Sequence, residues 1–456
     1  MLHYLKNRLK EIFSILIFSL FFISAQGQGN YILYGFRDVQ QGNYLNPAFT
    51  SKAKIVIGFP GLSNLDVSYF NTAGTFSDIV TTQNGNDSLK LDLSKVISQA
   101  HPVDHVNVSV NQDLLYVGVR VGQSFLSFGV KQRFLFRAFL PNDFFKLVWN
   151  GNSPYVGPPL DLKATIVNED HFIDYHLGAS IPVSKAVTVG LRVHILQGFS
   201  NIHTVNNLLQ VTTLNSSQQN FDIVASTDVE VNTAGLPDST GFDAGTYLNS
   251  FKNLGFTFDL GIDFEVTKQL KFSASLLDFG SISFKENTKT YKSKVDNLHF
   301  NSDQIDFANN DDPAKAIGDT LKEIFNISDF SQNYKSKLPV RVMFGGEYYS
   351  KDQRNRASIL FSGRFYPGYF EPAVSLAFDR TISKHFSFKV SYTYIKYDPI
   401  NVGLAFALNV KPFQFYMYTD NILGVSWDKQ RLVQVGFGLN IRIPDKKKLK
   451  TDSSND

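Results

Sequence analysis

Apolar and polar residues alternate along most of the chain, and this period of two is the pattern of β-strands with one apolar face. In the run from Gly255 to Val266, Phe, Leu, Ile and Val alternate with Gly, Thr, Asp and Glu. The run from Val433 to Ile443 repeats the scheme, with Gln, Gly, Asn and Arg on its second face. The pattern predicts fourteen strands, at residues 53–70, 105–121, 124–138, 171–181, 186–205, 254–266, 269–288, 339–349, 356–366, 370–381, 385–397, 400–411, 412–419 and 430–443.

The composition of the two strand faces indicates what surrounds the predicted sheet. The second face is rich in Gly, Ala and Ser, which suits a crowded or lumen-facing wall better than a surface in water. The apolar face is rich in Phe, and aromatic residues at both ends of apolar strands are typical of membrane interfaces. A water-soluble β-sandwich is the alternative, but we expect an all-β fold, a transmembrane antiparallel barrel of about 14 strands. The tyrosines predicted near strand ends are Tyr348, Tyr349, Tyr366, Tyr369, Tyr394, Tyr397, Tyr416 and Tyr418.

Thirteen connections separate the predicted strands, and six short ones and four long ones among them bear on the orientation of the barrel. Strict alternation of strand direction does not place all six short ones on one side in this assignment, which indicates that at least one boundary is wrong. The short connections, expected to include the periplasmic turns, lie at 122–123, 184–185, 268–269, 352–353, 383–384 and 411–412. The long ones, expected to be extracellular loops, are 71–104, 139–170, 206–253 and 289–338, with short helices predicted at 88–100, 141–149 and 313–326.

Composition narrows the class without changing the predicted fold. The 456 residues contain no Cys, which excludes disulfides, thiolate metal sites and a cysteine nucleophile. The 44 Lys and Arg against 41 Asp and Glu leave a formal net charge of +3, so nucleic acid is not an expected partner. A mean hydropathy of -0.12 excludes a helical membrane bundle but agrees with a barrel, in which lipid-facing and lumen-facing residues alternate.

Both ends of the chain differ from its strand-rich body. Residues 1–27 combine a basic start, an apolar run at 12–23 and the small residues of Ala25-Gln26-Gly27, which predicts a cleaved signal peptide. The apolar run is shorter than the ~20 residues that a membrane helix needs. We expect a protein of the bacterial outer membrane, with residues 28–51 as a hatch or lead-in segment, 52–443 as the barrel and 444–456 as a disordered basic periplasmic tail.

Seven charged residues are expected to face the barrel lumen. Asp259, Asp263 and Glu265 share one face of a predicted strand and would repel one another if nothing compensated their charges. A cation site or an acid–base set is the alternative reading of these carboxylates. We expect instead a structural network, with inward cations from other strands as partners: Arg120, Arg192, Arg364 and Lys389.

No residue pattern in the sequence predicts an enzyme. His171 and His176 are five residues apart, so in a strand their side chains point to opposite faces and cannot share a ligand. A Ser–His catalytic pair that used His194 would need a nucleophilic serine, but no Gly-x-Ser-x-Gly elbow occurs. Neither a P-loop nor a dinucleotide glycine pattern occurs. We therefore expect no catalytic residue, no metal and no cofactor.

Several stretches resemble known outer-membrane barrels. Asn46-Pro47-Ala48, after a polar segment, resembles the N-terminal region of FadL-type fatty-acid transporters and of PorV-like type 9 secretion barrels. That resemblance implies a fourteen-stranded barrel around an N-terminal hatch, with Asn46, Pro47 and Ala48 as hatch residues. The chain is also similar to an uncharacterised Bacteroidota barrel family, a domain of unknown function, at Phe59–Leu62, Phe125–Arg137, Asn142–Asn152 and Leu276–Phe284.

Two functions remain open. The resemblance implies a FadL-like channel or transporter for a small apolar molecule, with an apolar pocket lined from the Phe-rich segment Phe134 to Phe145. The alternative is a non-transporting barrel that acts as an accessory or scaffold partner of a cell-envelope machine, of the type 9 secretion or gliding type. Expected partners are accordingly outer-membrane lipids, a small hydrophobic ligand and envelope proteins.

Overall fold

The computed structural model describes residues 29–51, 53–82, 89–215, 222–236, 251–300, 326–366 and 369–444. The predicted signal peptide, residues 313–325 of a predicted helix and the tail after Pro444 lie outside these described residues. Within them, no helix is both long enough and apolar enough to cross a membrane.

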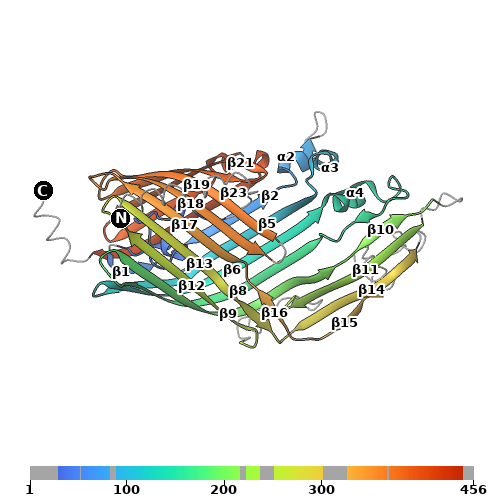
Figure 1. Ribbon diagram of the computed structural model, residues 1–456, viewed down its shortest axis with the longest axis horizontal. Helices are drawn as coiled ribbons and strands as arrows, with labels where there is room; N and C mark the ends of the chain where they lie inside the picture. The colour runs from blue at the N-terminus through green and yellow to red at the C-terminus, as the bar shows by residue number, and fades with distance from the viewer. Residues whose placement is uncertain are drawn as a thin grey trace, which may run out of the picture.

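The wall is a closed antiparallel barrel (Figure 1). Its first position is shared by β1 (Ala53–Gly58) and β2 (Leu65–Asn71), each of which pairs with both the next strand and the last one. This pairing closes the ring and gives fourteen wall positions among the described residues, as the alternation predicts. The other thirteen are, in wall order, β5 (Val103–Val121), β6 (Ser124–Pro141), β8 (Ile166–Pro182), β9 (Val187–Asn207), β12 (Leu254–Glu265), β13 (Leu270–Phe284), β17 (Val340–Tyr349), β18 (Asn355–Tyr366), β19 (Tyr369–Thr381), β20 (Phe386–Ile395), β21 (Asp398–Val410), β22 (Phe413–Thr419) and β23 (Leu432–Pro444).

All six short turns lie at one end of the barrel, which we call the turn end. Each turn follows an even-numbered wall position, and antiparallel pairing sends all such turns to the same side. The expectation that one boundary had to be wrong is therefore itself wrong. The last strand also finishes at the turn end, and the long connections lie at the opposite end, called the loop end (Figure 1).

On one side, the sheet continues past the loop end (Figure 1). There β9 pairs with β11 (Ile223–Ala234), which pairs with β14 (Thr288–Phe300), so the loops predicted at 206–253 and 289–338 are partly strands. The apolar pattern does not reveal them, because charged residues join them across the sheet: Lys292 lies 2.9 Å from Glu230. The short strands of this extension are β7 (Leu160–Asp161), β10 (Gln210–Thr213), β15 (Ser328–Phe330) and β16 (Tyr334–Lys337).

Short helices occupy the connections at the loop end. The helix α4 (Asn142–Asn150) matches the one predicted at 141–149 to within one residue, and Pro141 stands directly before it. The helix predicted at 88–100 is shorter than expected, because Leu89–Leu91 form a strand that pairs with Val80–Thr82. The elements concerned are α2 (Phe76–Ile79), β3 (Val80–Thr82), β4 (Leu89–Leu91) and α3 (Ser94–Gln99), and η4 (Ile422–Val425) and η5 (Trp427–Lys429) precede the last strand.

Alternation along the wall strands separates an apolar outer face from a polar lumen. In β20, Val390, Tyr392 and Tyr394 are exposed on the outer face, whereas Ser391 and Thr393 are buried inside the barrel. The small and polar second face noted in the sequence is therefore the lumen face in this strand.

The tyrosines predicted at the membrane interfaces divide between the two faces. Tyr348 and Tyr394 are exposed, as expected of such a belt. Tyr366, Tyr416 and Tyr418 are buried inside the barrel instead. Strand period decides this outcome, because Tyr416 and Tyr418 occupy alternate positions of β22 and so share its inner face.

Candidate functional site

Residues 29–51 lie inside the barrel, and we call them the lumen segment. Two short 3-10 helices, η1 (Tyr31–Leu33) and η2 (Gln40–Tyr44), give it compact turns. Its apolar side chains, such as Ile32, Phe36 and Phe49, are buried in one cluster with wall residues. A segment this irregular needs polar partners for its backbone, and the lumen face of the wall supplies them.

The turn Asn46-Pro47-Ala48 lies against two wall glycines. Gly261 of β12 and Gly190 of β9 are direct register partners, so they leave one shallow hollow on the lumen face. A Cβ atom on Gly261 would lie 2.1 Å from Asn46 Oδ1, and one on Gly190 would lie 2.1 Å from the carbonyl carbon of Pro47. Only glycine at both positions leaves room for this turn.

Hydrogen bonds hold the same turn in place. The Asn46 side-chain amide donates to the carbonyl oxygens of Ile262 and Ala274, at 3.2 and 3.1 Å. Its Oδ1 accepts the backbone N–H of Ala48 at 2.9 Å, and Ser180 donates to the Ala48 carbonyl at 3.0 Å. The three residues singled out in the sequence therefore form a closely packed, hydrogen-bonded contact between the lumen segment and the wall.

Charged groups attach the rest of the lumen segment to the wall. The Arg37 guanidinium forms two hydrogen bonds of 2.9 Å with Asp263 and a third of 3.1 Å with Glu347. Lys389 donates to the Tyr34 carbonyl oxygen at 2.6 Å. Three wall strands thus bind one short stretch of the segment through ionised side chains, which gives stronger hydrogen bonds than neutral groups do.

Asp420, between β22 and β23, holds the start of the lumen segment. Its two carboxyl oxygens accept the backbone N–H groups of Tyr31 and Ile32, at 3.0 and 2.8 Å. Burial raises the pKa of this carboxyl to about 8, although the two backbone N–H groups and Lys389 favour the charged form. This attachment therefore carries a proton that is lost at mildly alkaline pH.

A cavity of about 100 Å³, partly continuous with solvent, lies in the lumen on the loop-end side of the Asn46 turn. Gly29, Asn30, Tyr44 and Leu45 of the lumen segment form part of its lining, and the rest comes from the wall. Leu135 contributes an apolar side chain from the lumen face of β6, and the remaining lining is strongly charged. Its cations are Lys131, Arg133, Arg137, Arg192, Arg341 and Arg364, and its carboxylates are Asp66, Asp174, Asp259 and Asp278.

The three expected lumen carboxylates have different partners. Asp259 lies 3.1 Å from Arg192, a wall cation that the sequence singles out. Asp263 pairs with Arg37 of the lumen segment rather than with a wall cation. Glu265 is near the turn end, partly exposed, and pairs with Lys271 at 2.6 Å.

The other expected cations have partners elsewhere in the structure. Among the described residues, Arg192 is the only one of the four at ion-pair distance from those carboxylates. Arg364 lies 3.9 Å from Glu371, and Lys389 binds the lumen segment. Arg120 donates to the carbonyl oxygens of Gln123 and Ser51 near the turn end. Of the four expected cations, the structure therefore places Arg192 against these carboxylates, and the other charges form local pairs because strand register separates them along the lumen.

The apolar pocket expected from Phe134 to Phe145 is not what lines this cavity. Of that segment only Leu135, Phe136 and Arg137 reach it. Phe145 belongs instead to a small buried cluster with Ala73 and Val96 at the loop end.

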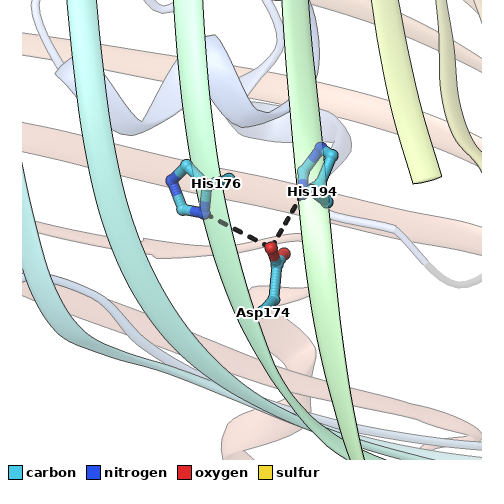
Figure 2. A group of neighbouring side chains, drawn as sticks. All are labelled: Asp174, His176 and His194. Atoms are coloured by element: carbon cyan, nitrogen blue, oxygen red, sulfur yellow. Dashed lines mark hydrogen bonds and ion pairs between the residues drawn. The ribbon is translucent and has the colours of Figure 1, made fainter. Parts of the chain in front are cut away.

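Reasoning from the sequence missed a cluster of titratable side chains in the cavity wall. Asp174 and His176 of β8 and His194 of β9 bring their ligand atoms within 4.8 Å of one another, and all three are buried (Figure 2). His176 and His194 are direct partners in the β8–β9 pairing. Comparing His176 with His171 along one strand could not find this group, because its members meet across two strands.

Three solved structures illustrate what the chain resembles. The TodX deltaS2S3 mutant monoaromatic hydrocarbon channel has a TM-score of 0.45 and 10% identity, with 92% of this chain and 96% of that one covered. The Ralstonia pickettii toluene transporter TbuX has a TM-score of 0.43 and 9% identity, with 89% and 94% covered. A Pseudomonas aeruginosa FadL homologue has a TM-score of 0.41 and 10% identity, with 88% and 93% covered.

Sequence comparison gives the family. No curated protein sequence matches the chain significantly. The sequence profile of a family of unknown function, DUF5723, matches residues 47–420, which is most of the barrel. The chain belongs to this family of unknown function.

Proposed function

We propose that the protein is an outer-membrane channel that takes up a small amphipathic molecule through the lumen cavity. The lumen segment is its hatch, and the loop end faces the outside of the cell. The alternative, a scaffold partner of an envelope machine, has no described feature of its own in support.

The outer face of the wall supports a membrane location. Large apolar side chains are exposed on strands around the ring; Phe256 and Phe344 are each 56% exposed and Leu376 is 53% exposed. A soluble protein rarely leaves so much contiguous apolar surface in water. A closed barrel with an even number of antiparallel strands can face lipid because every wall strand has hydrogen-bonded neighbours.

The cavity is the observation that carries the proposal of uptake. It is partly continuous with solvent, and its place beside the lumen segment puts a binding site directly before the hatch. Six cations line it against four carboxylates, which favours an anionic group on the ligand. The Leu135 side chain, on the lumen face of β6, gives the same ligand an apolar surface to lie against.

A wholly apolar cargo fits this lining less well than an amphipathic one. An apolar molecule that filled the cavity would displace water from the charged groups and give them no hydrogen bond in return. A carboxylate or sulfate with an apolar body avoids that cost.

A matched set of ten-carbon probes tests the proposal. The purified barrel in detergent is titrated with decanoate, decanol and decane, and uptake of labelled decanoate into proteoliposomes is measured in parallel. We expect decanoate to bind most tightly and to be taken up, and Arg341→Gln to weaken its binding about tenfold, or ~1.4 kcal/mol. Arg380→Gln, at an exposed residue of β19 outside the cavity, is the matched control.

Two outcomes would refute this function. Equal affinity for all three probes would show that the cavity does not select anions. Equal loss of decanoate affinity in Arg341→Gln and Arg380→Gln would show the same. Absence of decanoate uptake together with a stoichiometric envelope protein in native pull-downs would favour the scaffold alternative.

A further inference from the structure

We propose that Asp174, His176 and His194 bind one divalent transition-metal ion, of the zinc type, in the wall of the lumen cavity. The proposal concerns a property beyond transport and does not depend on it. Strand geometry brings the three together: Asp174 and His176 are two residues apart on β8 and share its lumen face, and His194 lies opposite His176 on β9. Figure 2 shows both imidazole rings turned toward the same carboxylate.

The distances among the ligand atoms are close to those of a metal site. Asp174 Oδ1 lies 2.8 Å from His194 Nδ1 and 3.5 Å from His176 Nδ1. A tetrahedral zinc ion with bonds of about 2.0–2.2 Å holds its ligand atoms about 3.4 Å apart. Opening the shorter contact by about half an ångström brings both carboxylate–imidazole distances close to that value, and all ligand atoms already lie within 4.8 Å of one another.

The hydrogen bonding of His176 points to a missing partner. The side chain is 2% exposed; Nε2 has no hydrogen-bond partner among the described residues, and Nδ1 has only the long ion-pair contact of 3.5 Å with Asp174. Burying an imidazole whose nitrogens lack good hydrogen bonds costs free energy, and metal coordination through Nδ1 is one way to satisfy that nitrogen. Its ring lies directly over Gly129, where a Cβ would be 2.4 Å from Nε2, so the wall leaves space for this ring position.

The nearby cations are directed to carboxylates other than Asp174. Arg192 lies 3.1 Å from Asp259, and Arg133 lies 2.6 Å from Asp278 but 4.0 Å from Asp174. The nearest polar contacts of Asp174 Oδ1 are thus the two histidines. A divalent cation bound to Asp174 and the two imidazoles would neutralise the charge of this buried carboxylate, which has no arginine at close range among the described residues.

An outer carboxylate orients one of the ligands. His194 Nε2 lies 3.1 Å from Asp259 Oδ2, so a proton on Nε2 leaves the Nδ1 lone pair for the metal. Asp259 is itself fixed by Arg192 and by the backbone N–H of Asp278 at 2.8 Å. Carboxylate–histidine–metal arrangements of this kind are typical of zinc sites.

Ligand chemistry selects the class of ion. Two imidazoles and one carboxylate favour zinc and its neighbours over Ca²⁺ and Mg²⁺, which prefer oxygen ligands. Three protein ligands leave a further coordination position, as in catalytic zinc sites. All three residues line the cavity, which provides the route of entry for the ion.

Metal binding to the intact barrel tests the proposal. Tag-free protein in detergent is equilibrated with Zn²⁺, and bound metal is counted by mass spectrometry; Co²⁺ is added separately and its visible d–d absorption recorded. We expect one Zn²⁺ per chain and a Co²⁺ spectrum of low coordination number that Zn²⁺ abolishes. His176→Gln and His194→Gln should each lower the Zn²⁺ affinity at least tenfold, and Asp259→Asn should lower it about 10–100-fold.

The control is His171→Gln, the same substitution on the same strand away from the cluster, and it should leave the affinity unchanged. Heat-modifiability on gels establishes that each variant forms a barrel. The Co²⁺ spectrum of the unmutated protein decides the question even if a variant fails to fold. Absence of both Zn²⁺ uptake and a Co²⁺ spectrum, or equal loss in His171→Gln, would overturn the proposal.

Discussion

A single methyl group at Gly261 should displace the lumen segment from the wall. In Gly261→Ala, the added Cβ would lie 2.1 Å from Asn46 Oδ1 and 2.8 Å from Pro47 Cδ. Ordinary contacts of this kind are above about 3.4 Å, so the turn must move by about 1 Å. That movement separates the Asn46 amide from the carbonyl oxygens of Ile262 and Ala274.

The expected size follows from these two hydrogen bonds. Each is worth about 0.5–1.5 kcal/mol net, so the attached state of the lumen segment loses about 1–3 kcal/mol. At a factor of ten for each 1.4 kcal/mol, the detached state becomes roughly fivefold to 150-fold more populated. Single-channel recordings in planar bilayers should show more frequent openings, and limited proteolysis should cut the lumen segment faster.

Gly346→Ala is the matched control for this experiment. Gly346 lies on β17, and a Cβ there would meet neighbours at ordinary distances of 3.4 Å and more. We expect this variant to behave as the unmutated protein does. If Gly261→Ala forms a heat-modifiable barrel with unchanged openings and proteolysis, the turn does not hold the segment and the reasoning fails.

Three further outcomes are expected. Deleting residues 28–51 should raise single-channel conductance, because the lumen segment occupies the barrel interior; unchanged conductance would contradict its role as a hatch. Asp263→Asn should lower the melting temperature modestly by releasing Arg37, and leave decanoate uptake within about twofold; lost uptake at an unchanged melting temperature would make Asp263 a ligand site instead. The attachment at Asp420 should weaken with pH, because the attached carboxyl holds its proton up to about pH 8 whereas a hydrated one loses it near 3.8. The stabilisation of the attached lumen segment by Asp420 is complete below pH 3.8 and is lost as pH rises through 8. Hydrogen exchange at the Ile32 amide, corrected for intrinsic rate, should therefore increase between pH 6 and 8.5. Asp420→Asn should remove that increase, and an increase that persists in this variant would exclude Asp420 as its cause.

The wall strands could be predicted from the sequence because each carries its own signal. A strand such as 386–395 places every second residue on the apolar outer face and the others on the lumen face, so the pattern is complete within one segment. The strands β11 and β14 beyond the loop end could not be found in this way. They lie past the loop end, and cross-strand charge pairs such as Lys292 with Glu230 link them. They therefore lack the apolar face that marks the wall strands.

The sequence by itself determined which residues of a strand face the lumen, including Asp259, Asp263 and His194. It did not determine what each one meets there, because the relative register of two strands is not contained in the period of either one. Asp263 meets Arg37 of the lumen segment, 226 residues away, and His194 meets His176 across the β8–β9 pairing. Only closure of the barrel around its N-terminal segment brings these groups together, so the candidate site is a property of the tertiary structure.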